Sequence, residues 1–197
     1  CQEKLSPERL EQLSKFPEQS RQHSLAGDLL AMTAYRKAYP GDLFPPERAV
    51  TPAGKPYFPA RPEFHHSISH SGEWVVCAVG AVPLGVDIQM ERPVRPVVFR
   101  ALSPVEQREL DGLEEQERFP AFFDVWCLKE AYSKAIGLGL KARFRDFSVS
   151  KKAEISVPCF SVALPRFGDC RYHLGICAQT VPMPRLQLQV VEKRALL

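Results

Sequence analysis

Long apolar runs are missing from this sequence. No stretch approaches the roughly 20 consecutive apolar residues that a membrane-spanning helix requires. The first residues also lack the basic start and the apolar stretch of a secretory signal. The sequence therefore predicts a protein without a membrane partner, and we expect it in the cytoplasm.

Closely spaced cysteine pairs are missing as well. The six cysteines form no Cys-x-x-Cys motif, which argues against a structural zinc site. Three of them, Cys77, Cys127 and Cys177, lie inside apolar runs. This usage predicts free, mostly buried thiols in a reducing compartment.

A strong excess of one charge is the third absence. The chain has 26 basic and 23 acidic residues, for a formal net charge of +3. This balance excludes a polybasic nucleic-acid binder but allows one local pocket for an anion. With 197 residues, the chain can form one large domain or two small lobes.

Helix signals dominate the first forty residues. Ser6-Pro7-Glu8 reads as an N-cap, a proline at the first helical position and an acidic first turn, which predicts a short helix ending near Phe16-Pro17. A longer helix is predicted over residues 18–39. Gly27 in its middle costs about 1 kcal/mol relative to alanine. We therefore expect another backbone or a ligand to approach closely at Gly27.

Strand patterns follow in two groups, with helical signals between them. The run over residues 74–80 is continuously apolar, which predicts a strand covered on both faces. Ser103 and Glu106 form a capping-box signature, and a second helix is predicted from about Phe119 or Ala121 to Ile136. The expected strands cover residues 64–69, 74–80, 84–89, 147–150, 160–164, 172–178 and 186–191. The fold class is therefore α+β, and helices followed by strands occur twice, as in an internal duplication.

The second of these helices places Trp126, Glu130 and Lys134 on one face, at positions i, i+4 and i+8. Gly137 and Gly139 then end it. On spacing alone, Glu130 and Lys134 could be an ordinary surface pair that stabilises the helix by about 0.2–0.5 kcal/mol. Other stretches of the chain decide between that interpretation and a functional one.

Four short stretches occur in a characteristic order: Ser67-Ile-Ser-His-Ser-Gly72, Leu84-Gly-Val-Asp-Ile-Gln89, Ser103-Pro-Val-Glu106 and Trp126-Cys-Leu-Lys-Glu-Ala-Tyr-Ser-Lys134. Together they resemble the Sfp-type 4′-phosphopantetheinyl transferases. The resemblance implies transfer of the phosphopantetheine arm of coenzyme A to a serine of an apo acyl or peptidyl carrier protein, with Mg²⁺ required and 3′,5′-ADP released.

The resemblance also implies an architecture. The family fold is a pseudo-twofold pair of similar α/β lobes in one monomeric chain, with the active site between them. We place the N-terminal lobe at residues 1–83 and the C-terminal lobe at residues 84–197. The family has a first strand that would precede Cys1, where this chain moves straight into a helix start.

The matching positions imply roles for individual residues. Asp87 and Glu130 resemble the Mg²⁺ ligands, and Glu130 or Glu106 the group that activates the carrier serine. Lys134 resembles the partner of the pyrophosphate and leaving group. The remaining coenzyme A contacts would be Ser69, His70 at the 3′-phosphate, Lys55 at the adenine end, Ser24 and Arg9.

Physical chemistry supports a metal site at Asp87. Asp87 and Gln89, two apart on a strand, point the same way. Mg²⁺ prefers one or two carboxylates together with phosphate oxygens and waters. Gln89 stands where the family usually has a second acidic ligand, so it could bind the metal only as a neutral ligand or through a water. We therefore expect weaker metal binding than in an all-carboxylate site.

Other interpretations stay open at this point. Gln89 favours a catalytically weak module that binds coenzyme A or a carrier protein, and a metal-dependent phosphoesterase is a third hypothesis. An alternative role for Glu106 is that it serves only in its capping box. A Ser-His-Asp hydrolase is disfavoured because Ser69 and His70, adjacent on a strand, face opposite sides. Metal binding by His65, His66 and His70 is disfavoured because the segment is extended.

Overall fold

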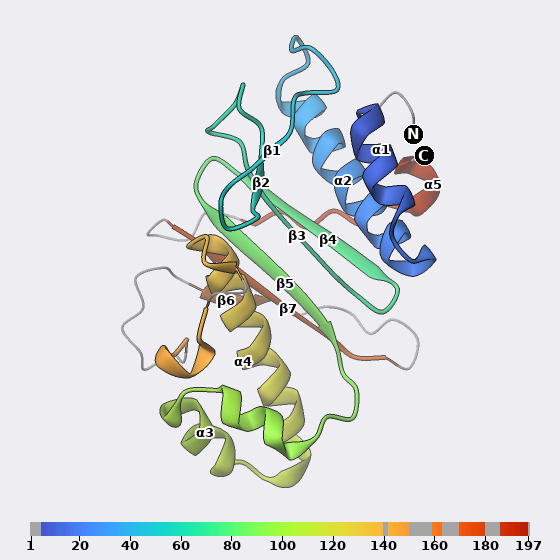
Figure 1. The fold of residues 1–197 in the computed structure, drawn as a ribbon. Coiled ribbons are helices and arrows are strands. Elements are labelled where there is room, and N and C mark those ends of the chain that lie inside the picture. Colours follow the sequence, from blue (N-terminus) through green and yellow to red (C-terminus); the bar gives the residue numbers. More distant parts are fainter. Residues whose placement is uncertain (1–4, 140–141, 150–158, 163–169, 180–185, 197) are drawn as a thin grey trace.

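The computed structural model describes residues 5–139, 142–149, 159–162, 170–179 and 186–196. These residues form an α+β fold in which two helix pairs flank a set of strands (Figure 1). The α-helices are α1 (Pro7–Ser14), α2 (Glu18–Ala38), α3 (Pro104–Asp111), α4 (Glu115–Ala135) and α5 (Lys193–Leu196), and two 3₁₀ helices cover Pro96–Ala101 and Phe144–Asp146. The strands are β1 (Ala49–Val50), β2 (Pro56–Tyr57), β3 (His65–Ser71), β4 (Trp74–Gly80), β5 (Leu84–Met90), β6 (Cys159–Val162) and β7 (Tyr172–Ala178).

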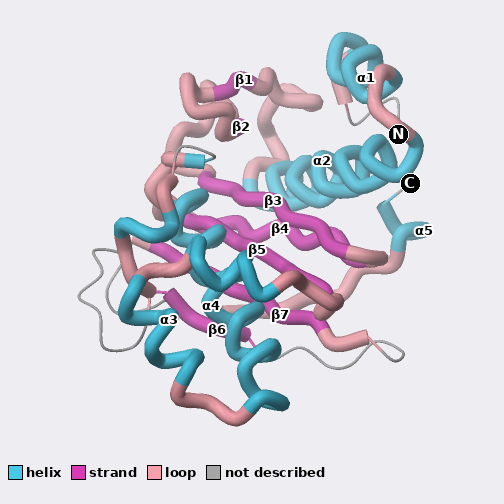
Figure 2. The backbone as a smooth tube through the Cα atoms, turned by 60° about the horizontal axis from the view of Figure 1, so that its bottom comes forward, coloured by secondary structure: helices cyan, strands magenta, loops and turns pink. Residues whose placement is uncertain are grey.

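The longer strands form two antiparallel groups. β3 and β4 make a hairpin in which His65 pairs with Gly80, and β5, β7 and β6 make a sheet in that order. Figure 2 shows the strands side by side, with α2 over the β3–β4 hairpin. α4 packs against β5 and β7. Each of the two 21-residue helices therefore covers one group of strands.

Glycines in the second sheet let α4 approach its backbone. A Cβ atom added at Gly85 of β5 would lie 2.0 Å from the carbonyl oxygen of Ala131, and one at Gly175 of β7 would lie 2.8 Å from the carbonyl oxygen of Cys127. No side chain fits in either place, so glycine is required. The close contact brings the C-terminal half of α4 directly over β5.

Several apolar clusters hold the elements together. The cluster around α2 contains Leu13, Tyr35 and Phe58, and Leu196 of α5 joins it although it lies at the far end of the chain. Figure 1 accordingly shows α5 beside α1 and α2. The cluster between α3 and α4 is built on Leu110 and on aromatic side chains of α4. No described helix has the length and apolar character needed to cross a membrane.

Most of the predicted elements are confirmed. Ser6 caps α1, and the Ser103–Glu106 capping box begins α3. The predicted strands over residues 64–69, 84–89 and 172–178 correspond to β3, β5 and β7, and 160–164 overlaps β6, with residues 163 and 164 outside the described ones. Gly137 and Gly139 follow the end of α4, both with positive φ.

Five structural predictions are wrong. The predicted strands over 186–191 and 147–150 do not form: residues 186–191 and 147–149 are not in strands, and residue 150 lies outside the described residues. α4 begins at Glu115, earlier than predicted, because Glu115 and Glu117 supply an acidic first turn ahead of Pro120. β4 is only half-buried along its length rather than covered on both faces. A Cβ atom at Gly27 would meet the Ile68 side chain at 2.6 Å, so a side chain, rather than a backbone or a ligand, approaches there.

The prediction of free thiols is wrong for two cysteines. Cys159 and Cys177 are directly opposite each other on β6 and β7 and form a disulfide. Cys77, Cys127 and Cys170 are free, and Cys127 is buried as expected. The sequence could not reveal the bond because it depends on the register of two strands that pair across 18 residues.

Candidate active site

The candidate site lies where β5 meets the last turns of α4. The carboxylate of Asp87 on β5 is almost completely buried. The Lys134 ammonium donates to Asp87 Oδ1 at 2.7 Å and to the Val86 carbonyl oxygen at 3.0 Å. The helix can reach the strand in this way because Gly85, two residues before Asp87, leaves room for the backbone of α4.

Glu130 lies one helical turn before Lys134 and is half-buried. Burial raises the pKa of Glu130, the nearby charge of Asp87 raises it further, and Lys134 opposes both effects. The structure therefore brings together two carboxylates and one ammonium, from one strand and one helix. A carboxyl group with a raised pKa is a better proton acceptor than an ordinary glutamate.

Two more side chains hold the Asp87 carboxylate. The Ser69 hydroxyl donates to Asp87 Oδ1 at 2.6 Å, and the Gln89 amide donates to Asp87 Oδ2 at 2.9 Å. Ser69 is itself buried. Ser69 and Gln89, predicted as a coenzyme A contact and a metal ligand, are thus both hydrogen-bonded to Asp87 here.

The oxygen atoms available at this site fit Mg²⁺ better than a metal whose whole coordination shell comes from protein side chains. Among the described residues, no group of three or more His, Cys, Asp or Glu side chains could enclose an ion. Mg²⁺ is usually bound by one or two carboxylates, with phosphate oxygens and waters completing its shell. Asp87 and Glu130 can provide such a pair, and Gln89 could add a neutral oxygen.

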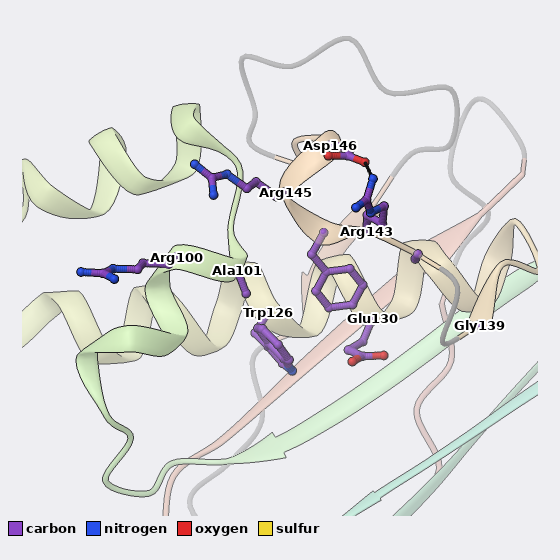
Figure 3. Close-up of a pocket in the computed structure, with 10 residues that line it drawn as sticks. Arg100, Ala101, Trp126, Glu130, Gly139, Arg143, Arg145 and Asp146 are labelled. Carbon is purple, nitrogen blue, oxygen red and sulfur yellow. Dashed lines mark ion pairs between the residues drawn. The ribbon is translucent and has the colours of Figure 1, made fainter.

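A pocket of about 510 Å³ opens beside Glu130. Figure 3 shows Trp126 and Glu130, one turn apart on α4, on the same side of it, while Arg100 extends away from it. The ring of Trp126 packs edge-on against Phe144. The Arg143 side chain turns toward Asp146, 4.0 Å away. These aromatic and acidic side chains therefore share the pocket with the arginines that also line it.

The other predicted coenzyme A contacts divide into two groups. Lys55 lies close to the site, since its ammonium donates to the Leu84 carbonyl at 2.9 Å and to the Lys134 carbonyl at 2.8 Å. His70 is exposed, and burial of part of its ring together with His23 and Lys134 lowers its pKa. Ser24 and Arg9 lie farther along the N-terminal helices. Ser24 follows His23, whose ring is 4.5 Å from that of His70, and Arg9 pairs with Asp28 at 2.7 Å.

Glu106 is the predicted site residue that the structure keeps away from the surface of the site. Its side chain is fully buried, and its oxygens accept hydrogen bonds from the backbone N–H groups of Ser103 and Val149 and from the Lys129 ammonium. The capping-box interpretation describes this geometry. No part of the carboxylate is left exposed to meet a carrier serine.

The sequence did not point to two polar residues at α4, Lys129 and His173. Lys129 is fully buried against Glu106. The sequence gave no sign of this, because lysine side chains are usually exposed. His173 on β7 places one ring nitrogen 2.7 Å from Asp124 of α4 and the other 2.8 Å from Glu91. Strand alternation could have put His173 on the α4 side of β7, but only the sheet register shows that it reaches both acids.

Comparison with known proteins agrees with the motifs. Residues 83–177, which contain β5, α4 and all of β7 except its last residue, match the model of the 4′-phosphopantetheinyl transferase superfamily. A 4′-phosphopantetheinyl transferase of Bacillus subtilis is 35% identical over 88% of this chain and 82% of its own length. The 4′-phosphopantetheinyl transferase Sfp of Bacillus subtilis strain 168 is 29% identical over 91% of this chain and 84% of its own length. By sequence, and with the strand and helix of its site in the matched region, the chain belongs to the 4′-phosphopantetheinyl transferase superfamily.

Proposed function

We propose that this chain transfers the 4′-phosphopantetheine group of coenzyme A to a serine of an apo acyl or peptidyl carrier protein and releases 3′,5′-ADP. The grouping of Asp87, Glu130 and Lys134 where β5 meets α4 carries the proposal. The relatives bear the name of this activity. We also infer that the chain works as a monomer of two similar lobes, residues 1–83 and 84–197, with the substrate between them.

Lys134 is suited to hold the phosphates of coenzyme A. An ammonium group has three N–H donors, of which Asp87 and the Val86 carbonyl take two. The third can reach a phosphate oxygen without breaking either contact. An ammonium near a pyrophosphate lowers the free energy of charge that builds up on the leaving group, by up to about 4 kcal/mol at 4 Å and an effective dielectric constant near 20.

Glu130 is suited to accept the proton of the carrier serine. It lines the pocket through which the serine would approach, and its raised pKa matches the task. When bound, Mg²⁺ would neutralise phosphate charge, and Asp87 and Glu130 would hold it, with Gln89 as a neutral or water-mediated ligand. Glu106 has no catalytic role in this proposal, since its carboxylate is buried against Lys129.

One assay tests the proposed transfer reaction directly. The protein is mixed with coenzyme A, Mg²⁺ and an apo carrier domain, and the carrier is weighed by mass spectrometry. We expect the mass to rise by one phosphopantetheine group. No gain with several carriers, and with Mn²⁺ in place of Mg²⁺, would refute the transferase; binding without transfer would then favour a coenzyme A or carrier-binding module, and hydrolysis without an acceptor a phosphoesterase.

Variants then test the assigned roles. Glu130→Gln and Lys134→Ala should each abolish most turnover while the circular dichroism spectrum stays unchanged. Gln89→Glu should lower the Mg²⁺ concentration needed for half-maximal rate, because a carboxylate replaces a neutral amide. An unchanged Mg²⁺ requirement would place Gln89 outside the metal shell.

A further inference from the structure

The β3–β4 hairpin and the second sheet are joined by three serine hydroxyls. Ser67 Oγ accepts a hydrogen bond from the Val86 N–H at 3.1 Å, Ser69 Oγ from the Ile88 N–H at 3.3 Å, and Ser71 Oγ from the Met90 N–H at 2.9 Å. Each bond joins residues 19 positions apart. The alternate side chains of β3 thus take the place that backbone carbonyls take in an ordinary sheet. We call Ser67, Ser69 and Ser71 the serine ladder.

A hydroxyl that accepts a hydrogen bond still has its own O–H to donate. Ser69 donates it to Asp87 Oδ1 at 2.6 Å. Among the contacts of the described residues, Ser67 and Ser71 make no such bond to an acidic side chain of the site. The middle rung of the ladder therefore does two things at once, because it links the strands and it holds the carboxylate.

Asp87 needs such a partner because its carboxylate can rotate. Lys134 also contacts Oδ1, but it reaches the strand on a long, flexible side chain that is partly exposed. Ser69 is short, buried and fixed by the Ile88 N–H. Gln89 also holds the carboxylate, through Oδ2, but it is only half-buried, so the serine is the shortest and most buried of the described partners that fix the carboxylate plane.

We propose that Ser69 is a positioning residue for the metal-binding carboxylate of Asp87, and that the serine ladder couples the register of the two strand groups to the orientation of that ligand. The assignment differs from a coenzyme A contact, since the hydroxyl proton and one lone pair of Ser69 are already used inside the protein. It rests on the proposed function only in that Asp87 binds the metal. Partners behind a metal ligand typically change metal affinity by about 10- to 100-fold when they are removed.

The serine ladder supplies its own control. Ser69→Ala and Ser67→Ala each remove one buried hydroxyl and leave one backbone N–H of β5 without its acceptor. The two variants should lose similar stability in urea unfolding. Only Ser69→Ala also removes the donor to Asp87.

The affinity for Mn²⁺ is measured by electron paramagnetic resonance, with and without coenzyme A. We expect Ser69→Ala to bind Mn²⁺ about tenfold more weakly than the unaltered protein, and Ser67→Ala to bind it as the unaltered protein does. Ser69→Cys keeps a side chain of similar size whose S–H donates only weakly, so its Mn²⁺ affinity should lie between those of the two alanine variants. This variant also provides the test if Ser69→Ala does not fold. In the carrier assay, Ser69→Ala should raise the Mg²⁺ concentration for half-maximal rate more than it lowers kcat.

The outcomes separate this proposal from the proposed function. Equal weakening by Ser69→Ala and Ser67→Ala would show that the effect is structural and would overturn the positioning role. Unchanged Mn²⁺ binding in Ser69→Ala, or no Mn²⁺ binding by the unaltered protein, would also overturn it. The variants could show the expected ranking of Mn²⁺ affinities while the unaltered protein transfers nothing to a carrier. That result would refute the transferase and support the role of Ser69.

Discussion

Helices α2 and α4 are equal in length, and each covers one group of strands, but they approach those strands in opposite ways. α2 contributes the glycine itself, and Gly27 faces the side chain of Ile68 on β3. Under α4 the glycines belong to the sheet, and the helix backbone rests on Gly85 and Gly175. The candidate site lies under the helix with the closer backbone contact, where side chains of α4 can reach a buried carboxylate on β5.

Each long helix forms an ion pair with the short helix before it, and these two ion pairs differ in burial. Arg9 of α1 pairs with Asp28 of α2, with 18% and 5% of the side chains exposed. Lys129 of α4 pairs with Glu106 of α3, and both side chains are completely buried. Water can still reach the first pair, whereas the second depends entirely on protein partners. The ion pair in the half that carries the site is therefore the one more sensitive to the loss of a partner.

The largest effect should come from filling the contact between α4 and β5. In Gly85→Ala the new methyl group would overlap the Ala131 carbonyl, so α4 must move away from the sheet. We expect a loss of about 4 kcal/mol or more of unfolding free energy, together with loss of transfer activity. Urea unfolding and the carrier assay measure the two effects.

Gly41→Ala is the matched control, because a Cβ atom there would meet nothing within 4 Å. It should leave both quantities near those of the unaltered protein. Near-native stability in Gly85→Ala would show that the close approach of α4 is not required.

The next largest effects concern the two ion pairs, which should differ in how much stability is lost when the cation is removed. Lys129→Met leaves the Glu106 carboxylate buried without its cation, which should cost about 3–5 kcal/mol. Arg9→Met removes the cation from a pair that water can reach in part, so we expect about 1–2 kcal/mol. Both are read from urea unfolding at pH 7. Equal losses would mean that the difference in burial has no energetic consequence.

The sequence revealed the local features of the site and missed those that depend on packing. The spacing of Glu130 and Lys134 placed both on one helix face, and alternation placed Asp87 and Gln89 on one strand face. Which partner each group takes depends on where α4 crosses β5, and the pair that forms is Lys134 with Asp87. Only the assembled structure shows that Ser69 is bonded to Asp87.

The errors in the fold have the same origin. Residues 186–191 alternate apolar and polar side chains as a strand does, but a strand also needs a neighbour, and in the described part of the chain this segment pairs with none. Cys159 and Cys177 meet only because β6 and β7 pair in one register. The starts of α1 and α3 were predictable because a side-chain cap acts over three or four residues, whereas α4 begins without a side-chain cap and its start was missed.

A smaller effect is expected on the α2 side. In Gly27→Ala the methyl group would meet the Ile68 side chain rather than a backbone. Overpacking costs about 1–3 kcal/mol, but alanine recovers about 1 kcal/mol of helix propensity. We expect a net loss of about 1 kcal/mol in thermal or urea unfolding. The pair Gly27→Ala and Ile68→Val should lose less than Gly27→Ala alone if this contact is the cause.

The smallest effect concerns His173, which links α4 to β7, the central strand of its sheet, and this effect depends on pH. Burial lowers the pKa of His173, but its hydrogen bonds to Asp124 and Glu91 outweigh burial, so the pKa is raised in the folded protein. A histidine with a raised pKa stabilises the fold fully below its unfolded value of about 6.5, and this contribution is lost as pH rises through the folded pKa.

Removing the imidazole should therefore matter most in acid. The unfolding free energy of His173→Gln should lie about 1 kcal/mol below that of the unaltered protein at pH 6, and the gap should narrow toward pH 9. The measurement is urea unfolding of both proteins across this range. A gap that stays constant or widens with pH would show that His173 is not held as a cation between the two acids.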